Sequence, residues 1–395
     1  MEWNCRNELL DSKILRRISM IYSEKASQFV SELPYRQGEY AGRNWGHPWH
    51  SLCSYHGKLK PAIAHLLIKE FTNPGEVVLD PLCGVGTIPF EACLQGRIGI
   101  GNDLSRMAYA ITKAKLEHPA RKEVDFVIDA LAKFIDENKE KYRVNPPLYS
   151  DFGYNGKIPE YFHEETYAEI LATREYFYEK ELTSADAMVL ACFLHVLHGN
   201  RPYALSRNSH PLTPYKPTGD YIYKNVIEHI CNKLDISYKK IELEDLSVGK
   251  AIHGDFSLLG DNLNEQVDAI ITSPPFTGSI RFYIQNWMRL WCAGWESEDF
   301  KKADIDFLEA KQKKSMDIYY DFFDMCYKVL KPQGKIILHL GNSKVCNMAD
   351  ELEIRAKDKF NIIFKGAEDV QEIEKHGIKD KGATFEHQFL FLEKK

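Results

Sequence analysis

Residues 270–276, with the sequence IITSPPF, join an apolar run to residue types that can hold a polar group. The β-branched run predicts a strand, and the two prolines predict that the strand ends there. Oxygen acceptors on Ser273 and Pro274, held rigidly by the prolines, could cradle a planar amine, with Phe276 as a stacking face. The alternative is a plain strand end followed by a Pro-Pro turn.

A second candidate site is the stretch VVLDPLCGVGTIPFEA at residues 77–92. A strand is predicted to end at Asp80, and Gly84 and Gly86 would form a turn whose backbone can approach a ligand closely. A dinucleotide fingerprint needs a third glycine where Pro89 stands, and a P-loop needs Gly-Lys-Ser/Thr, which this stretch does not supply. Loops that cradle phosphates are therefore disfavoured.

Asp103 follows Gly84 by nineteen residues, at the end of the second predicted strand. An acid at this place can accept hydrogen bonds from ribose hydroxyls, so the loop and the acid together favour an adenosine-bearing ligand without a phosphate. The alternative is an ordinary strand-to-helix turn in which Asp103 is the helix N-cap.

These two stretches carry a family resemblance. LDPLCGVGT resembles the D-P-F-C-G-S-G-T loop of S-adenosylmethionine-dependent amino-methyltransferases, and TSPPF resembles their (D/N/S)-P-P-(Y/F/W) catalytic motif. With HGKLKP upstream and HGDF before the catalytic strand, the likeness is to the DNA N4-cytosine and N6-adenine methyltransferase family. It covers approximately residues 50–117 and 250–395.

The resemblance implies a set of site residues, S-adenosylmethionine as the cofactor, S-adenosylhomocysteine as the product, and no metal. Asp80 would lie near the methionine moiety, Asp103 at the ribose and Asp255 near the adenine amine, although Asp255 could equally be a surface turn residue. Lys58, Lys60 and Pro61 match a segment that packs by the cofactor carboxylate, or they simply open an amphipathic helix. The implied catalytic residues are Ser273, Pro274, Pro275 and Phe276, and the implied cofactor-binding residues are Asp80, Pro81, Cys83, Gly84, Gly86, Thr87, Asp103, Asp255 and Lys60.

The chemistry that the resemblance implies is methyl transfer to an exocyclic amine. Because the amine lone pair is delocalised into the ring, acceptors on the amine protons must make the nitrogen more nucleophilic and align it with the S–CH3 bond. Ser273 and Pro274 would be those acceptors, and Phe276 would stack on a base flipped out of duplex DNA. Methylation at cytosine C5 needs a thiolate, usually in a Pro-Cys loop, and the chain has no Pro-Cys dipeptide. Serine in the first motif position favours cytosine N4 over adenine N6.

The elements that must position these residues alternate between strands and helices. Residues 77–117 are predicted to form strand, turn, helix, strand and helix, and five later stretches are strand candidates: KAIHGDF, VDAIITSPPF, GKIILHLGN, FNIIFKG and HQFLFLEK. The fold class expected is α/β, a doubly wound and mostly parallel sheet; the resemblance makes it a seven-stranded Rossmann-like methyltransferase sheet. The expected parts are an N-terminal arm at 1–49, catalytic halves at 50–117 and 251–395, and an insertion at 118–250.

The insertion is expected to be mainly helical and loop-rich, and by analogy with one permutation class of the family it is the candidate target-recognition region. Its stretch 201–224, RPYALSRNSHPLTPYKPTGDYIYK, interleaves basic and aromatic residues. Basic groups can hold phosphates while Arg and Asn contact base edges. The candidates are Arg201, Arg207, Asn208 and Lys216, and the alternative is a solvated loop that packs on the catalytic domain.

The composition is that of a globular protein, with 44% hydrophobic and 27% charged residues. A formal charge of -6 gives no whole-molecule attraction to nucleic acid, so binding would need a local basic surface. The nine cysteines are scattered without a C-x-x-C pair, which disfavours a disulfide framework or a structural zinc site. Because no apolar run is long enough for a bilayer and the N-terminus lacks a signal-peptide pattern, we expect a cytoplasmic protein with no membrane partner.

The function expected is site-specific DNA methylation at cytosine N4, with double-stranded DNA as the partner and a companion restriction endonuclease as a further candidate partner. Three alternatives stay open: an N6-adenine DNA methyltransferase, an RNA methyltransferase acting on guanine N2 or adenine N6, and a catalytically idle module that binds an adenosine ligand.

Overall fold

The computed structural model describes residues 20–395 except 43–44, 56, 155, 200, 211–214, 240, 242–245, 264, 279–280, 371–373, 376–377 and 380–383. Its main sheet has seven strands in the order β3-β2-β1-β4-β5-β9-β6. These strands are β1 (Val77–Asp80), β2 (Ile98–Asp103), β3 (Lys250–His253), β4 (Val267–Thr272), β5 (Leu330–Ser343), β6 (Phe360–Asp369) and β9 (Thr384–Lys394). A separate pair consists of β7 (Glu374–Lys375) and β8 (Ile378–Lys379).

Most neighbouring strands of the sheet are parallel. β1 pairs in parallel with β2 and β4, β2 with β3, and β4 with β5, whereas β9 is antiparallel to both β5 and β6. The expected mostly parallel, Rossmann-like sheet is therefore confirmed, and the strand that breaks the parallel pattern is the last one of the chain.

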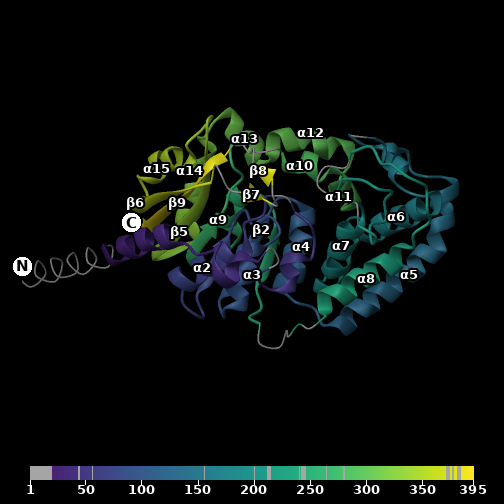
Figure 1. Cartoon of the computed structure of the whole chain (residues 1–395), viewed down its shortest axis with the longest axis horizontal. Helices are drawn as coiled ribbons and strands as arrows, with labels where there is room; N and C mark the ends of the chain where they lie inside the picture. The colour runs from purple at the N-terminus through teal and green to yellow at the C-terminus, as the bar shows by residue number, and fades with distance from the viewer. Residues whose placement is uncertain are drawn as a thin grey trace, which may run out of the picture.

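Helices cover both faces of the sheet. Successive strand residues point to opposite faces, and apolar residues on both faces are buried under helices. On one face, Leu79 and Ile270 pack against α14 (Ile318–Val329) and α15 (Met348–Ala356). On the other face, Val78 and Ile271 pack against α2 (Pro61–Phe71) and a helix over residues 20–32. The two remaining helices of the first half are α3 (Thr87–Leu94) and α4 (Arg106–Leu116). The sheet is thus doubly wound (Figure 1).

The insertion is mainly helical, as expected. It contains α5 (Arg121–Val144), α6 (Glu164–Phe177), α7 (Ser184–Val196) and α8 (Val226–Tyr238), with the short turns η3 (Leu148–Asp151) and η4 (Ile158–Tyr161). Figure 1 shows these helices grouped at one end of the molecule, beside α4 and away from α15. Residues of α7 such as Leu190 share one hydrophobic core with Met107 of α4.

A second helical segment lies between β4 and β5. It consists of α10 (Phe282–Gln285), α11 (Trp287–Cys292), α12 (Ser297–Asp306) and α13 (Leu308–Lys314). Trp287 and Trp291 of α11 are buried in the core that the insertion shares with α4, so this segment joins the insertion to the part of the chain that forms the sheet. The other short helices are η1 (Gly38–Ala41), η2 (Pro48–Ser51), η5 (Phe256–Leu258) and α9 (Leu259–Asn262).

Candidate active site

The four motif positions meet at one edge of the sheet. Asp80 ends β1, Asp103 ends β2, Asp255 follows β3 by two residues, and the stretch 273–276 follows β4 directly. Because β3, β2, β1 and β4 are adjacent and parallel, their carboxyl ends line the same edge. This is the edge at which open α/β sheets bind ligands.

The glycine loop has a backbone that other residues fit poorly. Gly84 and Gly86 have φ angles of 51° and 68°, and Gly86 is the N-cap of α3. A Cβ atom at Gly86 would lie 2.8 Å from the Thr112 hydroxyl oxygen, and one at Gly84 would lie 3.1 Å from the Tyr55 hydroxyl oxygen. The loop is therefore a tight turn enclosed by side chains.

Asp103 ties the glycine loop to the second strand. Its carboxylate accepts a hydrogen bond from the backbone N–H of Gly84 at 2.9 Å and one from the backbone N–H of Ser105 at 2.8 Å. The N-cap of α4 is Ser105, whose side chain accepts from the N–H of Ala108, so the alternative of Asp103 as the cap is wrong. Asp103 instead lies between the loop and the sheet edge.

Two carboxyl groups of this edge are poorly solvated. Burial, with a smaller contribution from the neighbouring Asp103, raises the pKa of Asp80 to about 7. Burial also raises the pKa of Asp103 to about 7, with Glu309 acting in the same direction. A ligand with sulfonium and ammonium groups would favour the ionised carboxylates, so this acidic edge fits S-adenosylmethionine.

Three other predicted cofactor residues are part of the loop itself. The Pro81 carbonyl accepts a hydrogen bond from the Asn102 side chain at 3.0 Å, and Thr87 is the buried first residue of α3. Cys83 is buried with its sulfur 3.5 Å from the Thr112 hydroxyl, and burial holds the pKa of the Cys83 thiol well above its usual value. The thiol therefore packs in the loop and does not provide a thiolate nucleophile.

The upstream lysines open α2. Lys60 is the N-cap position of α2, and its ammonium nitrogen lies 4.7 Å from the centre of the Tyr35 ring. Lys58 donates a hydrogen bond to the His50 carbonyl at 2.6 Å. Contact of either lysine with the cofactor carboxylate stays a prediction.

Asp255 caps a turn at the sheet edge. Its carboxylate accepts from the backbone N–H of Ser257 at 2.9 Å and lies 3.4 Å from the ammonium of Lys311. Burial works against ionisation, but the hydrogen bonds from Ser257 and the charge of Lys311 hold the pKa of Asp255 below its usual value. Asp255 is therefore a turn residue, as the alternative reading expected. Its turn also lies at the end of β3, so contact of Asp255 with the adenine amine of the cofactor stays a prediction.

The SPPF stretch, residues 273–276, is fixed by two elements outside it. The Ser273 hydroxyl oxygen lies 3.0 Å from Nδ1 of His339 on β5. The Pro275 carbonyl accepts a hydrogen bond from the Gln312 side chain at 2.8 Å, and Gln312 in turn accepts one from the Tyr319 hydroxyl at 2.9 Å. These contacts hold the loop from the β5 side and from α13.

Phe276 lies against β5. Its ring centre is 5.5 Å from that of His339 and 5.8 Å from that of His387. A Cβ atom at Gly341 would lie 2.7 Å from the Phe276 ring, so the ring packs closely on the backbone of β5. Stacking of Phe276 on a flipped base stays a prediction.

Sequence reasoning missed His339, Gln312 and Tyr55. His339 interrupts the apolar strand stretch IILHLG, and that break in the pattern was a signal for a buried polar contact. Tyr55 stacks on Phe282 with ring centres 5.1 Å apart, beside the glycine loop. Gln312 has no sequence signal that would single it out.

The predicted nucleic-acid residues are largely engaged within their own loop. Arg207 donates to the Gly219 carbonyl at 2.6 Å and lies 4.0 Å from the Tyr221 ring centre. Arg201 is exposed and hydrogen-bonded to the Tyr203 hydroxyl. Asn208 bridges Gly199 and Thr218 through its backbone, and Lys216 is exposed. Their contact with nucleic acid stays a prediction.

Within the part of the chain that the structure describes, no group of three or more His, Cys, Asp or Glu side chains could hold a metal ion. Over the same described residues, every helix is too short or too polar to cross a membrane.

The sheet is that of a Rossmann-like α/β domain, and a family match to its first half supports a methyltransferase. Residues 48–145, which contain the glycine loop and Asp103, match the family described as UPF0020, RMKL-like methyltransferase domain. Such a domain implies S-adenosylmethionine as the methyl donor. No curated protein matches the chain in sequence.

Similar solved structures include several methyltransferases. TrmN from Thermus thermophilus is 13% identical over 88% of this chain and 52% of its own length, with a TM-score of 0.36. An rRNA methylase from Streptococcus thermophilus is 9% identical over 84% of this chain and 94% of its own length, with a TM-score of 0.31. The rRNA methyltransferase AviRa from Streptomyces viridochromogenes is 9% identical over 87% of this chain and 88% of its own length, with a TM-score of 0.32. The chain thus spans about half the length of TrmN.

Proposed function

We propose that this chain transfers a methyl group from S-adenosylmethionine to the exocyclic N4 amine of a cytosine flipped out of duplex DNA. The observation that carries the proposal is the rigid SPPF stretch at the end of β4, immediately beside the strand β1 that leads into the glycine loop. Substrate amine and methyl donor would therefore be held at neighbouring strand ends.

In this proposal, the chain's own residues form the cofactor site. Asp80 and Asp103 would face the cationic and hydroxyl-bearing parts of the cofactor, and the glycine turn would let its backbone approach closely. The bound cofactor supplies an electrophilic methyl group.

Ser273 and Pro274 would orient the amine. Each amine proton needs one acceptor, and the Ser273 oxygen and the Pro274 carbonyl provide two on a rigid backbone. Burial and the neighbouring His387 hold the pKa of His339 well below its usual value, so His339 is neutral. His339 is therefore suited to orient the Ser273 hydroxyl and not to carry a proton away as a cation.

The choice of base rests on Ser273. A hydroxyl in the first motif position is the feature that favours cytosine N4 over adenine N6. Double-stranded DNA is accordingly the proposed partner, and a companion restriction endonuclease would fit such an enzyme.

The test is expression in a bacterial host without DNA methylation, followed by single-molecule sequencing of its genomic DNA. A Ser273→Ala, Pro274→Ala variant is the control. N4-methylcytosine in one short motif, absent with the variant, is the expected result. N6-methyladenine would keep the mechanism and change the base. Unmodified DNA from a folded, cofactor-binding protein would overturn the DNA proposal and make cellular RNA the next substrate to test.

A further inference from the structure

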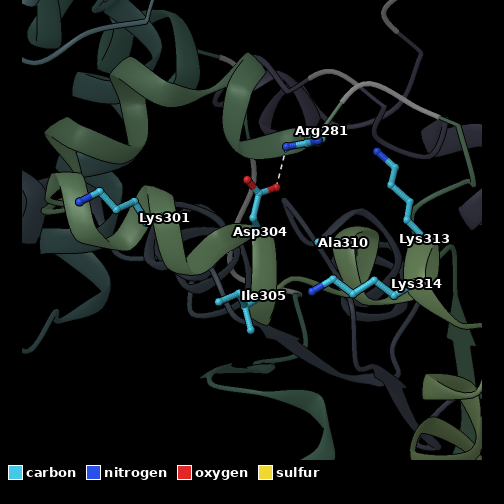
Figure 2. Close-up of a pocket in the computed structure, with 7 residues that line it drawn as sticks. All are labelled: Arg281, Lys301, Asp304, Ile305, Ala310, Lys313 and Lys314. Atoms are coloured by element: carbon cyan, nitrogen blue, oxygen red, sulfur yellow. Dashed lines mark hydrogen bonds and ion pairs between the residues drawn. The ribbon is translucent and has the colours of Figure 1, made fainter.

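A pocket of about 480 Å³ lies between α12, α13 and the start of α10. Figure 2 shows Lys313 and Lys314 extending from α13, with Arg281 and Asp304 facing each other. The lining residues are Arg281, Lys301, Asp304, Ile305, Ala310, Lys313 and Lys314.

The lining of this α12–α13 pocket is strongly cationic. Four of its side chains are basic, and the single carboxylate among them, Asp304, is already paired with Arg281 at 2.6 Å. Lys301 is paired with Glu298 outside the lining at 2.5 Å. Lys313 and Lys314 are exposed and form no ion pair with any described residue, and Lys313 acts only through space on the Glu309 carboxylate. Two ammonium groups are therefore available to an anionic ligand.

The same helix that carries these lysines supports the catalytic stretch. Gln312, directly before Lys313, holds the Pro275 carbonyl at 2.8 Å. Glu309 lies one turn earlier on α13. Its two carboxylate oxygens accept hydrogen bonds, at 2.8 and 3.0 Å, from the backbone N–H of Phe282, the residue directly after Arg281. The pocket and the catalytic loop thus share α13 as their support.

We propose that the α12–α13 pocket binds backbone phosphates of duplex DNA next to the flipped nucleotide; this inference rests on the proposed function. An enzyme that extrudes a base must hold the flanking backbone, and lysines do so without regard to sequence. A chain with a formal charge of -6 needs a local basic surface for this purpose. The pocket supplies one, whereas Arg207 and Lys224 of the 201–224 loop donate to backbone carbonyls.

The experiment compares Lys313→Gln, Lys314→Gln with the wild-type chain in binding to a short duplex that carries the sequence methylated in cells. Fluorescence anisotropy is measured at several salt concentrations between about 50 and 200 mM. Loss of two phosphate contacts should weaken binding roughly 10-fold or more and reduce the slope of log K against log salt by about 2. The KM for DNA should rise with little change in kcat, and cofactor affinity should not change.

Two controls accompany the variant. Lys69→Gln, Lys122→Gln removes the same charge from exposed lysines of α2 and α5 and should keep wild-type binding. Lys313→Arg, Lys314→Arg keeps the charge and should retain most of the affinity.

The outcomes separate the two proposals. If the wild-type chain methylates DNA but the Lys313→Gln, Lys314→Gln variant keeps its affinity and salt slope, the pocket assignment alone is overturned. An equal loss in the Lys69→Gln, Lys122→Gln control overturns it as well. If the wild-type chain neither binds nor methylates any duplex, the proposed function fails, and the pocket assignment fails with it.

Discussion

The Ser273 hydroxyl oxygen lies 3.0 Å from Nδ1 of His339, so a side chain of β5 orients the first residue of the SPPF stretch. His339 is only 4% exposed, and burial keeps it neutral. A neutral imidazole whose Nδ1 accepts a hydrogen bond from the Ser273 hydroxyl leaves the serine lone pairs free for the substrate amine.

His339→Ala should therefore lower kcat roughly 10- to 100-fold, because a misoriented acceptor no longer aligns the amine. The KM for DNA and the affinity for the cofactor should change little, since neither ligand needs His339 for binding. Steady-state kinetics on a methylatable duplex gives this comparison.

The pH profile separates orientation from proton transfer. Because the pKa of His339 lies well below its usual value, the wild-type kcat should show no break from His339 between about pH 6 and pH 8. A break that His339→Ala abolishes would show that His339 exchanges a proton during turnover.

The poorly solvated acids Asp80 and Asp103 make a second prediction. The pKa of Asp80 rises from 3.8 in its model compounds to about 7 in the fold, and Asp103 behaves in the same way. When the pKa of an acid is higher in the folded than in the unfolded protein, the acid stabilises the fold at pH values below its unfolded-state pKa. This stabilisation is lost as the pH rises through the folded-state pKa. The cofactor-free protein should therefore melt at lower temperature at pH 8 than at pH 5.

Asp80→Asn isolates this effect. It removes a carboxylate that is ionised at pH 8 in a poorly solvated place, so the free energy of unfolding at pH 8 should rise by roughly 2–4 kcal/mol. Cofactor affinity should fall roughly 10-fold or more, because the cationic ligand loses a carboxylate. Calorimetric titration and thermal unfolding at both pH values measure the two effects. A variant that binds the cofactor as tightly as the wild-type chain would remove Asp80 from the site.

The glycine loop offers a third prediction with a built-in comparison. Gly86 has a left-handed φ of 68°, and an alanine Cβ there would also lie 2.8 Å from the Thr112 hydroxyl oxygen. Gly75 has a φ of 84°, but an alanine Cβ there would face open space. The strain alone costs about 1–2 kcal/mol, so Gly75→Ala should lose that much stability and Gly86→Ala more. Urea unfolding gives both values, and equal losses would show that Thr112 moves aside.

Sequence reasoning reached the parts of the site that are contiguous along the chain. The glycine loop and the SPPF stretch each follow a short β-branched run, so local pattern alone predicted that they end strands. The contacts of Ser273 with His339 and of Pro275 with Gln312 join residues 66 and 37 positions apart. They depend on β4 and β5 being neighbours and on a helix, α13, that no pattern had predicted.

The direction of the last strand was beyond the sequence for a similar reason. An apolar stretch such as HQFLFLEK predicts a strand, but the path of the chain decides whether that strand runs parallel to its neighbours. β9 enters between β5 and β6 and is antiparallel to both. Its residue His387 thereby comes to lie beside Phe276, 5.8 Å between ring centres.

The packing of Phe276 on Gly341 makes the last prediction. A Cβ atom at position 341 would lie 2.7 Å from the ring, so Gly341→Ala must displace Phe276 from β5. If Phe276 provides the stacking face for the flipped base, transfer to DNA should fall roughly 10-fold, while cofactor binding stays unchanged. Phe276→Leu should show the same loss because it removes the aromatic face without crowding β5. Full activity in Phe276→Leu would mean that the ring only fills space against the strand.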